Sequence, residues 1–382
     1  MAQKDIPTLR IGLLGFGSMG RTHTWAVRNL PFHYEGLPFR AETVGVCTTS
    51  MEKSSRVCAK FGIDGAYDRE DDLIARTDVD IIDVCTPNLY HYAAVKKALS
   101  AGKHVLCEKP LAISPAEADE LVALAAKSGK TCGMVFNNRW IAPVLRAKQL
   151  IDEGRIGRVL HFDASYLHNS CIDPDRRAGW KQDKTVCGGG VLFDLGAHVI
   201  DLMIWLCGSI VRVSGMEQIA YPSHPDANGN DWLTNADEAF YLFCRTADDA
   251  CGTITVSKIT QGANDDLSFA IYGEKGSLRF SLMEPNWLGF YDTSAPSGPQ
   301  GGTRGFTKIE CVNRYPNMIF PSPKAPAGWL NGHLESMRAF LSAVAENRPF
   351  APSFADGAEV QRVMDAAYRS AANGSKLTEV SR

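Results

Sequence analysis

The sequence predicts a two-domain α/β protein in which a doubly wound parallel sheet is followed by an α+β domain. Three observations support this. The chain has 382 residues, more than the roughly 250–300 at which a single hydrophobic core stops growing. Short β-branched runs alternate with longer helical runs up to about Cys132. Beyond Gly133 the pattern becomes that of antiparallel strands with a few helices.

The first part of the chain contains four apolar runs typical of buried strands, at 11–17, 42–47, 80–87 and 104–110. Helical patterns occur at 19–30, 51–61, 90–101 and 115–128. Ser114 and Pro115 read as the cap and first residue of the last helix, and Gly129 as its stop. Continuous apolar strands separated by helices indicate a parallel sheet covered on both faces. Right-handed crossovers then give a doubly wound domain.

The second part begins with a helix, a glycine turn and a strand over residues 146–168. Alternating patterns then predict further strands, within 238–245, 252–258, 267–280 and 308–313. Helices are expected at 190–206, 330–346 and 354–372, and a Gly-, Pro- and Ser-rich loop at 293–305. We therefore divide the chain into domains at residues 1–134 and 135–382.

Composition points to a globular protein with a small-molecule partner. Hydrophobic residues make up 45% and charged residues 22% of the chain, which excludes disordered and fibrous classes. Forty basic and 43 acidic side chains leave a net charge of −3. No Lys/Arg run marks a nucleic-acid or anionic-membrane surface, so we expect neither partner.

Cysteine usage and the chain start indicate a cytoplasmic protein. The eleven cysteines are scattered without a CxxC pair, as expected for reduced core thiols in a reducing compartment. The start lacks the pattern of a signal peptide. The most apolar stretch, Val199 to Val211, contains Asp201 and is too short for a membrane-spanning helix.

A GxGxxG motif follows the first predicted strand and opens a helix. Glycines there permit a tight turn and close approach of a pyrophosphate, while the helix N-terminus supplies N–H groups. We expect this turn to bind a dinucleotide through Gly15, Gly17, Ser18, Met19 and Gly20. An ordinary glycine-rich turn is the alternative.

The second predicted strand lacks the acidic residue that usually binds the ribose 2′-hydroxyl. It ends in Cys47 and is followed by Thr48, Thr49 and Ser50. We expect Thr48 to contact the cofactor ribose, and the choice between NAD and NADP stays open.

Two further motifs place polar residues at the carboxyl ends of strands, the edge where ligands bind in open α/β sheets. The next strand ends in a segment expected to contact the cofactor through Thr86, Pro87, Asn88 and His91. The following strand ends in Glu108, Lys109 and Pro110. A lysine at the end of an apolar strand is costly to bury unless it is paired or used, which makes Lys109 a catalytic candidate. An exposed lysine is the alternative.

A glycine run at 188–190 precedes Asp194 and His198, which are four residues apart and therefore share a face of the predicted helix. A carboxylate beside an imidazole raises the pKa of the imidazole toward values useful in proton transfer. A purely structural ion pair is the alternative.

These motifs together resemble the Gfo/Idh/MocA oxidoreductases. The match rests on the order GxGxxG, TPNxxH, EKP and GGGxxxDxGxHxxD, and it extends over nearly the whole chain. The resemblance implies a Rossmann domain followed by a domain with a large open antiparallel sheet that commonly forms an oligomer interface. It also implies hydride transfer between NAD or NADP and a secondary alcohol carbon of a sugar, polyol or glycoside.

The resemblance further implies roles for individual residues. Lys109 would bind the substrate hydroxyl beside the cofactor and stabilise the alkoxide, Asp194 would orient the substrate, and His198 would be the acid/base. This requires the Lys109 ammonium and the His198 imidazole to converge over one nicotinamide ring. Glu108 is expected at the cofactor. The pocket is expected to include Tyr166, His168, Trp180 and Lys181, with Arg177 nearby.

Other interpretations stay open. The same site could begin a longer reaction in which tightly held cofactor oxidises a glycoside to a ketone that then eliminates. A member of this fold could instead be a non-catalytic NAD(P)-binding sensor or regulator. Ligand contact is one of two interpretations for Asn138, Arg139 and His333, the other being a structural role, and the sequence names no partner for His33 or His224. A homodimer or homotetramer is expected, whereas the substrate and the direction of the reaction are open.

Overall fold

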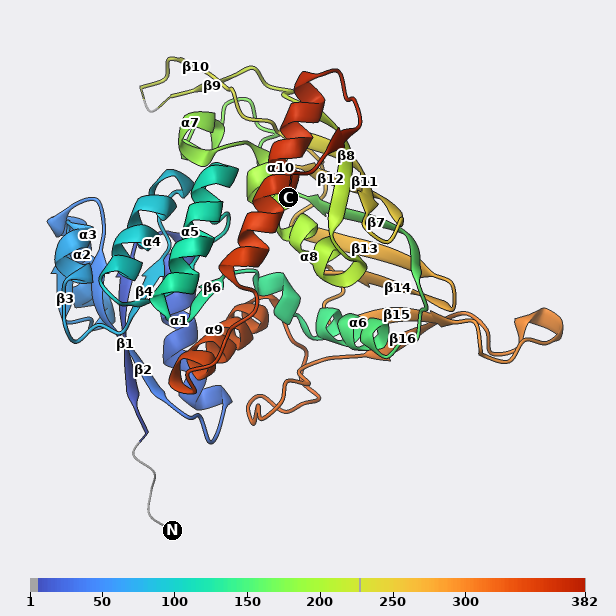
Figure 1. Cartoon of the computed structure of the whole chain (residues 1–382), viewed down its shortest axis with the longest axis horizontal. Coiled ribbons are helices and arrows are strands. Elements are labelled where there is room, and N and C mark those ends of the chain that lie inside the picture. Colours follow the sequence, from blue (N-terminus) through green and yellow to red (C-terminus); the bar gives the residue numbers. More distant parts are fainter. Residues whose placement is uncertain (1–5, 227, 382) are drawn as a thin grey trace, which may run out of the picture. The chain divides into compact units, whose positions relative to one another are not determined.

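The computed structural model describes residues 6–226 and 228–381, and the chain divides into two compact units (Figure 1). Unit 1 contains Met1–Trp140, Tyr315–Pro323 and Trp329–Ala358. Unit 2 contains Ile141–Arg314, Lys324–Gly328 and Glu359–Arg382. Unit 1 thus includes late segments of the chain that a single boundary after residue 134 leaves out.

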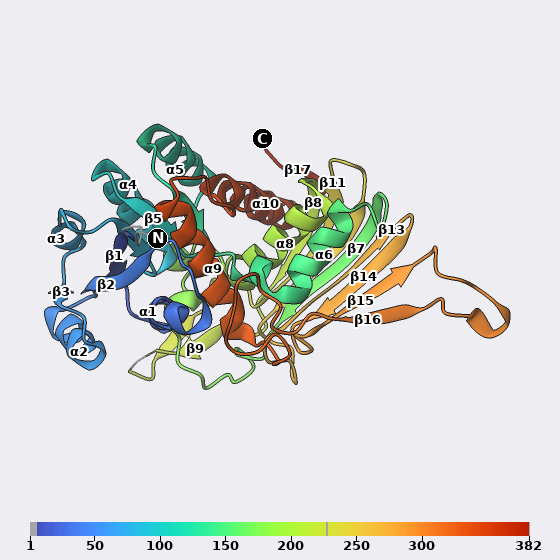
Figure 2. The ribbon, with the colours of Figure 1, turned by 90° about the horizontal axis from the view of Figure 1, so that it is seen from below.

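Unit 1 is built on a six-stranded parallel sheet with the order β3-β2-β1-β4-β5-β6. The strands are β1 (Thr8–Leu14), β2 (Arg40–Cys47), β3 (Gly65–Tyr67), β4 (Ile81–Val84), β5 (His104–Cys107) and β6 (Cys132–Met134). The helices between them are α1 (Ser18–His33), α2 (Met51–Phe61), α3 (Glu70–Ile74), α4 (His91–Ser100) and α5 (Pro115–Ser128). Helices α1 and α2 lie on one face of the sheet, and α4 and α5 on the other (Figure 2). The doubly wound prediction is confirmed.

Local capping explains where the helices of unit 1 begin and end. The Ser114 side chain accepts a hydrogen bond from the Glu117 N–H at the start of α5, and Gly129 ends that helix in the left-handed conformation. Helix α2 is capped in the same way by Ser50 and Gly62. These caps satisfy backbone groups that a helix end leaves unpaired.

Helix α9 (Trp329–Ala345) comes from late in the sequence but belongs to unit 1. It packs along α1, and the Tyr34 hydroxyl donates a 2.6 Å hydrogen bond to the Glu335 carboxylate. Most of α9 is buried, so this helix is part of the core of unit 1.

Unit 2 is built on a nine-stranded, mainly antiparallel sheet with the order β16-β15-β14-β13-β7-β12-β11-β8-β17. Only the β7–β12 pair is parallel in the described sheet. Its strands are β7 (Val159–Leu167), β8 (Ile210–Gln218), β11 (Ala239–Thr246), β12 (Cys251–Ser257), β13 (Asp266–Gly273), β14 (Gly276–Ser281), β15 (Trp287–Asp292), β16 (Phe306–Glu310) and β17 (Thr378–Glu379). A separate hairpin pairs β9 (Ser223–Pro225) with β10 (Asp231–Leu233).

The helices of unit 2 are α6 (Ala142–Asp152), α7 (Lys184–Cys187), α8 (Ala197–Cys207) and most of α10 (Phe354–Ala372). Figure 2 shows α6 and α8 along one face of the large sheet. On the other face side chains such as Phe243, which is 67% exposed, point to solvent. The expected loop at 293–305 joins β15 to β16 and projects from the sheet (Figures 1 and 2).

The expected helix at 190–206 is not α-helical throughout. Residues Leu192–Gly196 form a π-helical turn that leads into α8. The helical stretch Lys184–Cys207 has 24 residues and is apolar enough to cross a membrane, but 78% of its most apolar window is buried inside the structure. That burial is typical of the core helix of a globular domain.

Candidate active site

The glycine turn after β1 has backbone geometry that only glycine fits. Gly15 has a φ of +87°, and a Cβ there would lie 2.5 Å from the carbonyl oxygen of Cys85. A Cβ on Gly20 would lie 2.5 Å from the carbonyl oxygen of Gly15. The turn therefore brings α1 close to the ends of β1 and β4, as the GxGxxG pattern predicts.

The N-terminus of α1 is suited to an anion. Gly17 is exposed, and a Cβ on it would meet no atom within 4 Å. No side chain among the described residues caps this helix, and its first turn contains no acidic residue. Because the first N–H groups of a helix carry partial positive charge, this open end fits a pyrophosphate. Ser18 and Met19 form the first turn beside it.

The carboxyl ends of β1, β4 and β5 meet at one edge of the sheet. Leu14 is in register with Val84, and Val84 with Cys107. The strand order reverses between β1 and β4, which is the place where open α/β sheets bind ligands. The glycine turn, the segment after β4 and the segment after β5 are therefore neighbours, as expected.

The segment after β4 is held by His91, which is fully buried. One ring nitrogen of His91 lies 2.7 Å from the carbonyl oxygen of Pro110 and the other 2.8 Å from that of Thr86. His91 thus joins the two segments through the main chain. The hydroxyl of Thr86 is buried without a hydrogen-bond partner among the described residues, and the side chain of Asn88 is buried beside Pro87. An unsatisfied buried hydroxyl at this edge fits a polar ligand.

The segment after β5 begins with Glu108, whose carboxylate is buried. Its Oε1 lies 3.2 Å from Nε2 of His23, and its Oε2 accepts a hydrogen bond from the N–H of Lys109. Burial raises the pKa of Glu108, but His23, Lys109 and His333 together lower it to about 2. Glu108 is therefore an anion that fixes the backbone of Lys109, which has a cis peptide bond to Pro110 and a half-buried side chain.

His23 is a buried residue of α1 that the sequence interpretation did not single out. Its Nδ1 lies 2.9 Å from the Asp83 carboxylate, and Cys85 contacts the same nitrogen. Burial lowers the pKa of His23, but Asp83 and Cys85 raise it well above its ordinary value.

The end of β2 carries the expected hydroxyl groups. The hydroxyl of Thr48 lies 2.9 Å from that of Ser54, and the N–H of Thr48 donates to the carbonyl of Tyr67 at the end of β3. Burial raises the pKa of the Cys47 thiol to about 11, and nearby carboxylates add to that shift: Glu70, Asp68 and Asp72. Acidic groups therefore act on this strand end, although they come from the residue after β3 and from α3.

In unit 2 the glycine run is fixed by Asp237, a buried residue. The Asp237 carboxylate accepts hydrogen bonds from the N–H groups of Gly190 and Leu192, at 2.8 and 3.0 Å, and from the Tyr368 hydroxyl. A Cβ on Gly190 would lie 2.0 Å from the carbonyl oxygen of Asp237. This close approach explains the glycine and positions the turn that carries Asp194.

Asp194 lies between two lysines. The ammonium of Lys181 is 2.8 and 2.9 Å from its two oxygens, and that of Lys258 is 2.9 Å from Oδ2. Lys181 is exposed, whereas Lys258 is 6% exposed at the end of β12. Burial lowers the pKa of Lys258, but Asp194 outweighs that effect and raises it.

A second carboxylate, Asp265, organises the aromatic candidates. It accepts a 2.6 Å hydrogen bond from the Tyr166 hydroxyl and lies 3.0 Å from Nε2 of His168. Burial raises the pKa of Asp265, but His168, Tyr166 and His198 lower it below its ordinary value. The Tyr166 ring packs edge-on to that of His198, with centroids 6.0 Å apart. His198 is 9% exposed.

The remaining candidates are distributed between the two units. The Trp180 ring is exposed and lies 5.7 Å from the Lys181 ammonium, and Arg177 is exposed on the same segment. Arg139 is buried and forms a 2.8 Å ion pair with Asp356. Three other residues are buried and contact identified side chains. Asn138 accepts a hydrogen bond from Asn137, the His333 ring packs against that of Trp329, and His224 lies 3.2 Å from the Glu238 carboxylate.

The sequence interpretation missed Lys258, Asp265 and Asp237. Lys258 ends an alternating strand pattern, so the argument that singled out Lys109 applies to it equally. Nothing in the local pattern marks the two aspartates, because their partners are distant in sequence.

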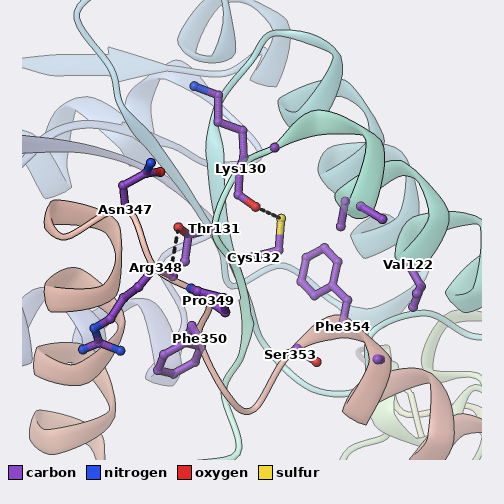
Figure 3. A pocket seen from close by; sticks show the side chains of 14 residues that line it. Val122, Lys130, Thr131, Cys132, Asn347, Arg348, Pro349, Phe350, Ser353 and Phe354 are labelled. Atoms are coloured by element: carbon purple, nitrogen blue, oxygen red, sulfur yellow. Dashed lines mark hydrogen bonds between the residues drawn. The ribbon is translucent and has the colours of Figure 1, made fainter.

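A separate cavity of about 520 Å³ lies at the β6 edge of unit 1. It is lined by residues of α5, of β6 and of the segment 347–355 (Figure 3). None of the motif residues described above lines it, so we do not assign it to the candidate active site.

Comparison with known proteins identifies the family. Residues 9–136 match the family model described as "Oxidoreductase family, NAD-binding Rossmann fold", and residues 144–279 match the GFO/IDH/MocA C-terminal domain. Levoglucosan dehydrogenase of Pseudarthrobacter phenanthrenivorans is 28% identical over 382 residues, which cover 96% of this chain and 97% of that protein.

Solved structures agree with this match. Levoglucosan dehydrogenase in complex with NADH and levoglucosan superposes with a TM-score of 0.93 at 28% identity, covering 98% of this chain and all of that one. An oxidoreductase domain protein from Kribbella flavida is 32% identical with a TM-score of 0.92, again covering 98% of this chain and all of that one. The chain therefore belongs to the Gfo/Idh/MocA family of oxidoreductases with an NAD-binding Rossmann fold.

Proposed function

We propose that the protein is an NAD-dependent dehydrogenase that oxidises a secondary alcohol of a sugar, polyol or glycoside. The observation that carries the proposal is a set of polar side chains of unit 2 from distant positions. Hydrogen bonds and a ring contact join Tyr166, His168, His198 and Asp265, and ion pairs join Lys181, Asp194 and Lys258. Donors and acceptors at such density suit a ligand rich in hydroxyl groups.

The chemistry follows from the residue types. Bound nicotinamide supplies a hydride acceptor. In the proposed reaction His198 takes the hydroxyl proton as the hydride leaves, and Lys109 stabilises the developing alkoxide. Asp194 orients the substrate by accepting a hydrogen bond from a neighbouring hydroxyl. The proposal requires Lys109 and His198 to face the same substrate carbon.

The relatives support a sugar substrate. The levoglucosan dehydrogenase that matches this chain along nearly its whole length acts on a sugar, and its solved complexes contain NADH with levoglucosan or with L-sorbose. The residues expected to carry the reaction are all present here, which favours an enzyme over a sensor that has lost its chemistry.

We also propose that NAD rather than NADP is the cofactor. The carboxylates of Asp68, Glu70 and Asp72 lie near Cys47 at the end of β2, where the adenosine ribose is expected. A 2′-phosphate at this position would be repelled by these groups. The Thr48 hydroxyl lies at the same strand end, where it is hydrogen-bonded to Ser50 or Ser54 and can accept a further hydrogen bond from a ribose hydroxyl.

The test is hydride transfer by the purified protein. We expect NADH to appear at 340 nm when NAD is mixed with one or more members of a panel of monosaccharides, anhydrosugars, cyclitols and glycosides. NAD binding without turnover across the panel would instead favour the sensor. A product that eliminates without net NADH release, detected by mass spectrometry, would indicate the longer reaction.

The open face of the nine-stranded sheet is the proposed oligomer interface. Its exposed residues include Met216, Tyr241 and Phe243, and Met216 is paired with Tyr241 across β8 and β11. Exposed apolar groups on a sheet face favour association of copies. We expect a homodimer or homotetramer in analytical ultracentrifugation, and a shift toward monomer for Phe243→Glu.

A further inference from the structure

The buried lysine at the end of β12 is held from several directions. The N–H of Lys258 donates to the carbonyl of Glu238, and its own carbonyl accepts from the N–H of Cys171. Its ammonium contacts the Asp194 carboxylate at 2.9 Å. The backbone of this residue is therefore held by two hydrogen bonds and its ammonium by an ion pair.

Lys181 makes the second contact with Asp194 but differs in its surroundings. Its side chain is 45% exposed, against 8% for that of Lys258, and it belongs to the short helical turn Trp180–Gln182. An exposed ion pair between a lysine and a carboxylate is weak, and the lysine easily exchanges its partner. A buried pair is rigid, and removing one member leaves an uncompensated charge.

We propose that Lys258 is a positioning residue that holds the Asp194 carboxylate in its substrate-orienting position, while Lys181 is the exchangeable contact on the solvent side. This proposal rests on the proposed function, because Asp194 is assigned there to orient the substrate. Lys258 itself contacts neither substrate nor cofactor in this scheme.

The charged groups around the pair fit this role. The carboxylate of Asp237, which fixes the turn carrying Asp194, also acts electrostatically on Lys258. The other titratable groups that face the pair are Lys181, Tyr166, Cys171 and Cys187. One ammonium thus contacts the carboxylate that this turn carries and interacts electrostatically with the carboxylate that fixes the turn, so its loss should change the geometry as well as the charge.

The experiment compares three single variants of the full-length protein. In Lys258→Met the side chain keeps most of its volume but loses its charge. We expect the Asp194 carboxylate to move as a result, and a displacement of about 1 Å should lower kcat on the order of 100-fold. Lys181→Met should raise KM with kcat within about threefold of wild type, because it removes an exchangeable contact. Lys258→Arg restores the cation and should regain part of kcat.

Lys103 provides the matched control. Lys103 directly precedes β5, at the opposite end of that strand from Glu108. It is 8% exposed, and its ammonium donates hydrogen bonds to the carbonyls of Arg76 and Val79. Lys103→Met should lower the Tm but leave kcat and its pH profile unchanged. For Lys258→Met, in contrast, the acid limb of the kcat profile should move to higher pH, because Asp194 loses a cation that stabilises its ionised form.

A double variant keeps the proposal testable if Lys258→Met folds poorly. Asp194→Asn combined with Lys258→Met removes both charges and should regain stability relative to Lys258→Met. Its kcat should equal that of Asp194→Asn alone, because Lys258 acts through Asp194. Additive losses in kcat, or a Lys258→Met enzyme with wild-type kcat and pH profile, would overturn the proposal.

A crystal structure of Lys258→Met separates this proposal from the proposed function. We expect the Asp194 carboxylate to leave its wild-type position, whether or not the wild-type protein oxidises any sugar tested. An unmoved carboxylate refutes the role of Lys258. A wild-type protein without hydride transfer refutes the proposed function. The position of the Asp194 carboxylate in the variant then still tests whether Lys258 holds it.

Discussion

Nε2 of His23 lies 3.2 Å from Oε1 of Glu108, so that the helix after the glycine turn is tied to the residue that precedes Lys109. The other nitrogen of the same ring contacts Asp83 at 2.9 Å. A single buried imidazole thereby links α1, β4 and the segment after β5. The charge of this imidazole should matter for the stability of unit 1.

Replacing His23 should make the loss of stability depend on pH. Because the folded-state pKa of His23 is raised, its stabilising contribution is complete below its unfolded pKa of about 6.5 and is lost as pH rises through the folded value. His23→Gln should therefore cost about 3 kcal/mol in the free energy of unfolding at pH 6, and less at pH 10. Urea unfolding at both pH values measures this, and an equal cost at both would contradict it.

Two glycines of the turn should respond differently to alanine. A Cβ at position 17 meets nothing within 4 Å, so Gly17→Ala should keep the wild-type Tm while NAD binding weakens about tenfold, because the methyl group obstructs the phosphate. Gly20→Ala should lower the Tm, since its Cβ would clash with the Gly15 carbonyl. Gly328→Ala, also in open space, should change neither quantity in thermal melts and calorimetric titration.

Lys109 should be needed for catalysis more than for cofactor binding. Lys109→Met is expected to lower kcat/KM by about 100-fold or more through loss of alkoxide stabilisation, with the Kd for NAD within about threefold of wild type. Steady-state kinetics and fluorescence titration measure the two quantities. Unchanged activity on every substrate of the wild-type enzyme would remove Lys109 from the mechanism.

His198 should set the pH dependence of the reaction. We expect kcat/KM of the wild type to rise through a limb between roughly pH 6 and 8, and this limb to be absent in His198→Asn, whose residual rate falls about 100-fold or more. His161→Asn is the control, because His161 is exposed on the sheet and pairs with Asp163. A retained limb in His198→Asn would assign the base to another group.

The acidic groups near the end of β2 should determine cofactor preference. We expect the Kd for NAD to be at least about tenfold lower than that for NADP, since a 2′-phosphate meets repulsion there. Asp68→Asn should bring the Kd for NADP closer to the Kd for NAD, chiefly by improving NADP binding. High salt should have the same effect. Calorimetric titration gives both constants, and a preference for NADP in the wild type would refute this assignment.

Local patterns were sufficient to predict the parallel sheet and the glycine turn of unit 1, but not the addition of α9 from late in the chain or the role of His23. The glycine turn, the caps of α5 and the polar residues after β4 and β5 depend on contacts between near neighbours in sequence or between strands of a regular parallel sheet. The positions of Gly15 and Gly20 follow from steric limits that any chain with this turn must obey.

Unit 2 could be predicted only in part, because its contacts are distant in sequence. Tyr166 and Asp265 are 99 residues apart, and no periodicity connects them. The spacing of Asp194 and His198 predicts an α-helix, but the turn at Leu192–Gly196 is π-helical. Lys258 differs from these residues, because the strand predicted at 252–258 ends in this lysine and local reasoning could have singled it out, although it is not among the predicted site residues.

The packing of α9 along α1 has a consequence for biosynthesis. A nascent chain that has left the ribosome only as far as residue 134 contains every strand of the parallel sheet but lacks the helix that buries one side of α1. The nucleotide-binding half must therefore wait for nearly the whole polypeptide to be translated before its core is complete. During that interval the exposed side of α1 is a surface on which a chaperone would be expected to act.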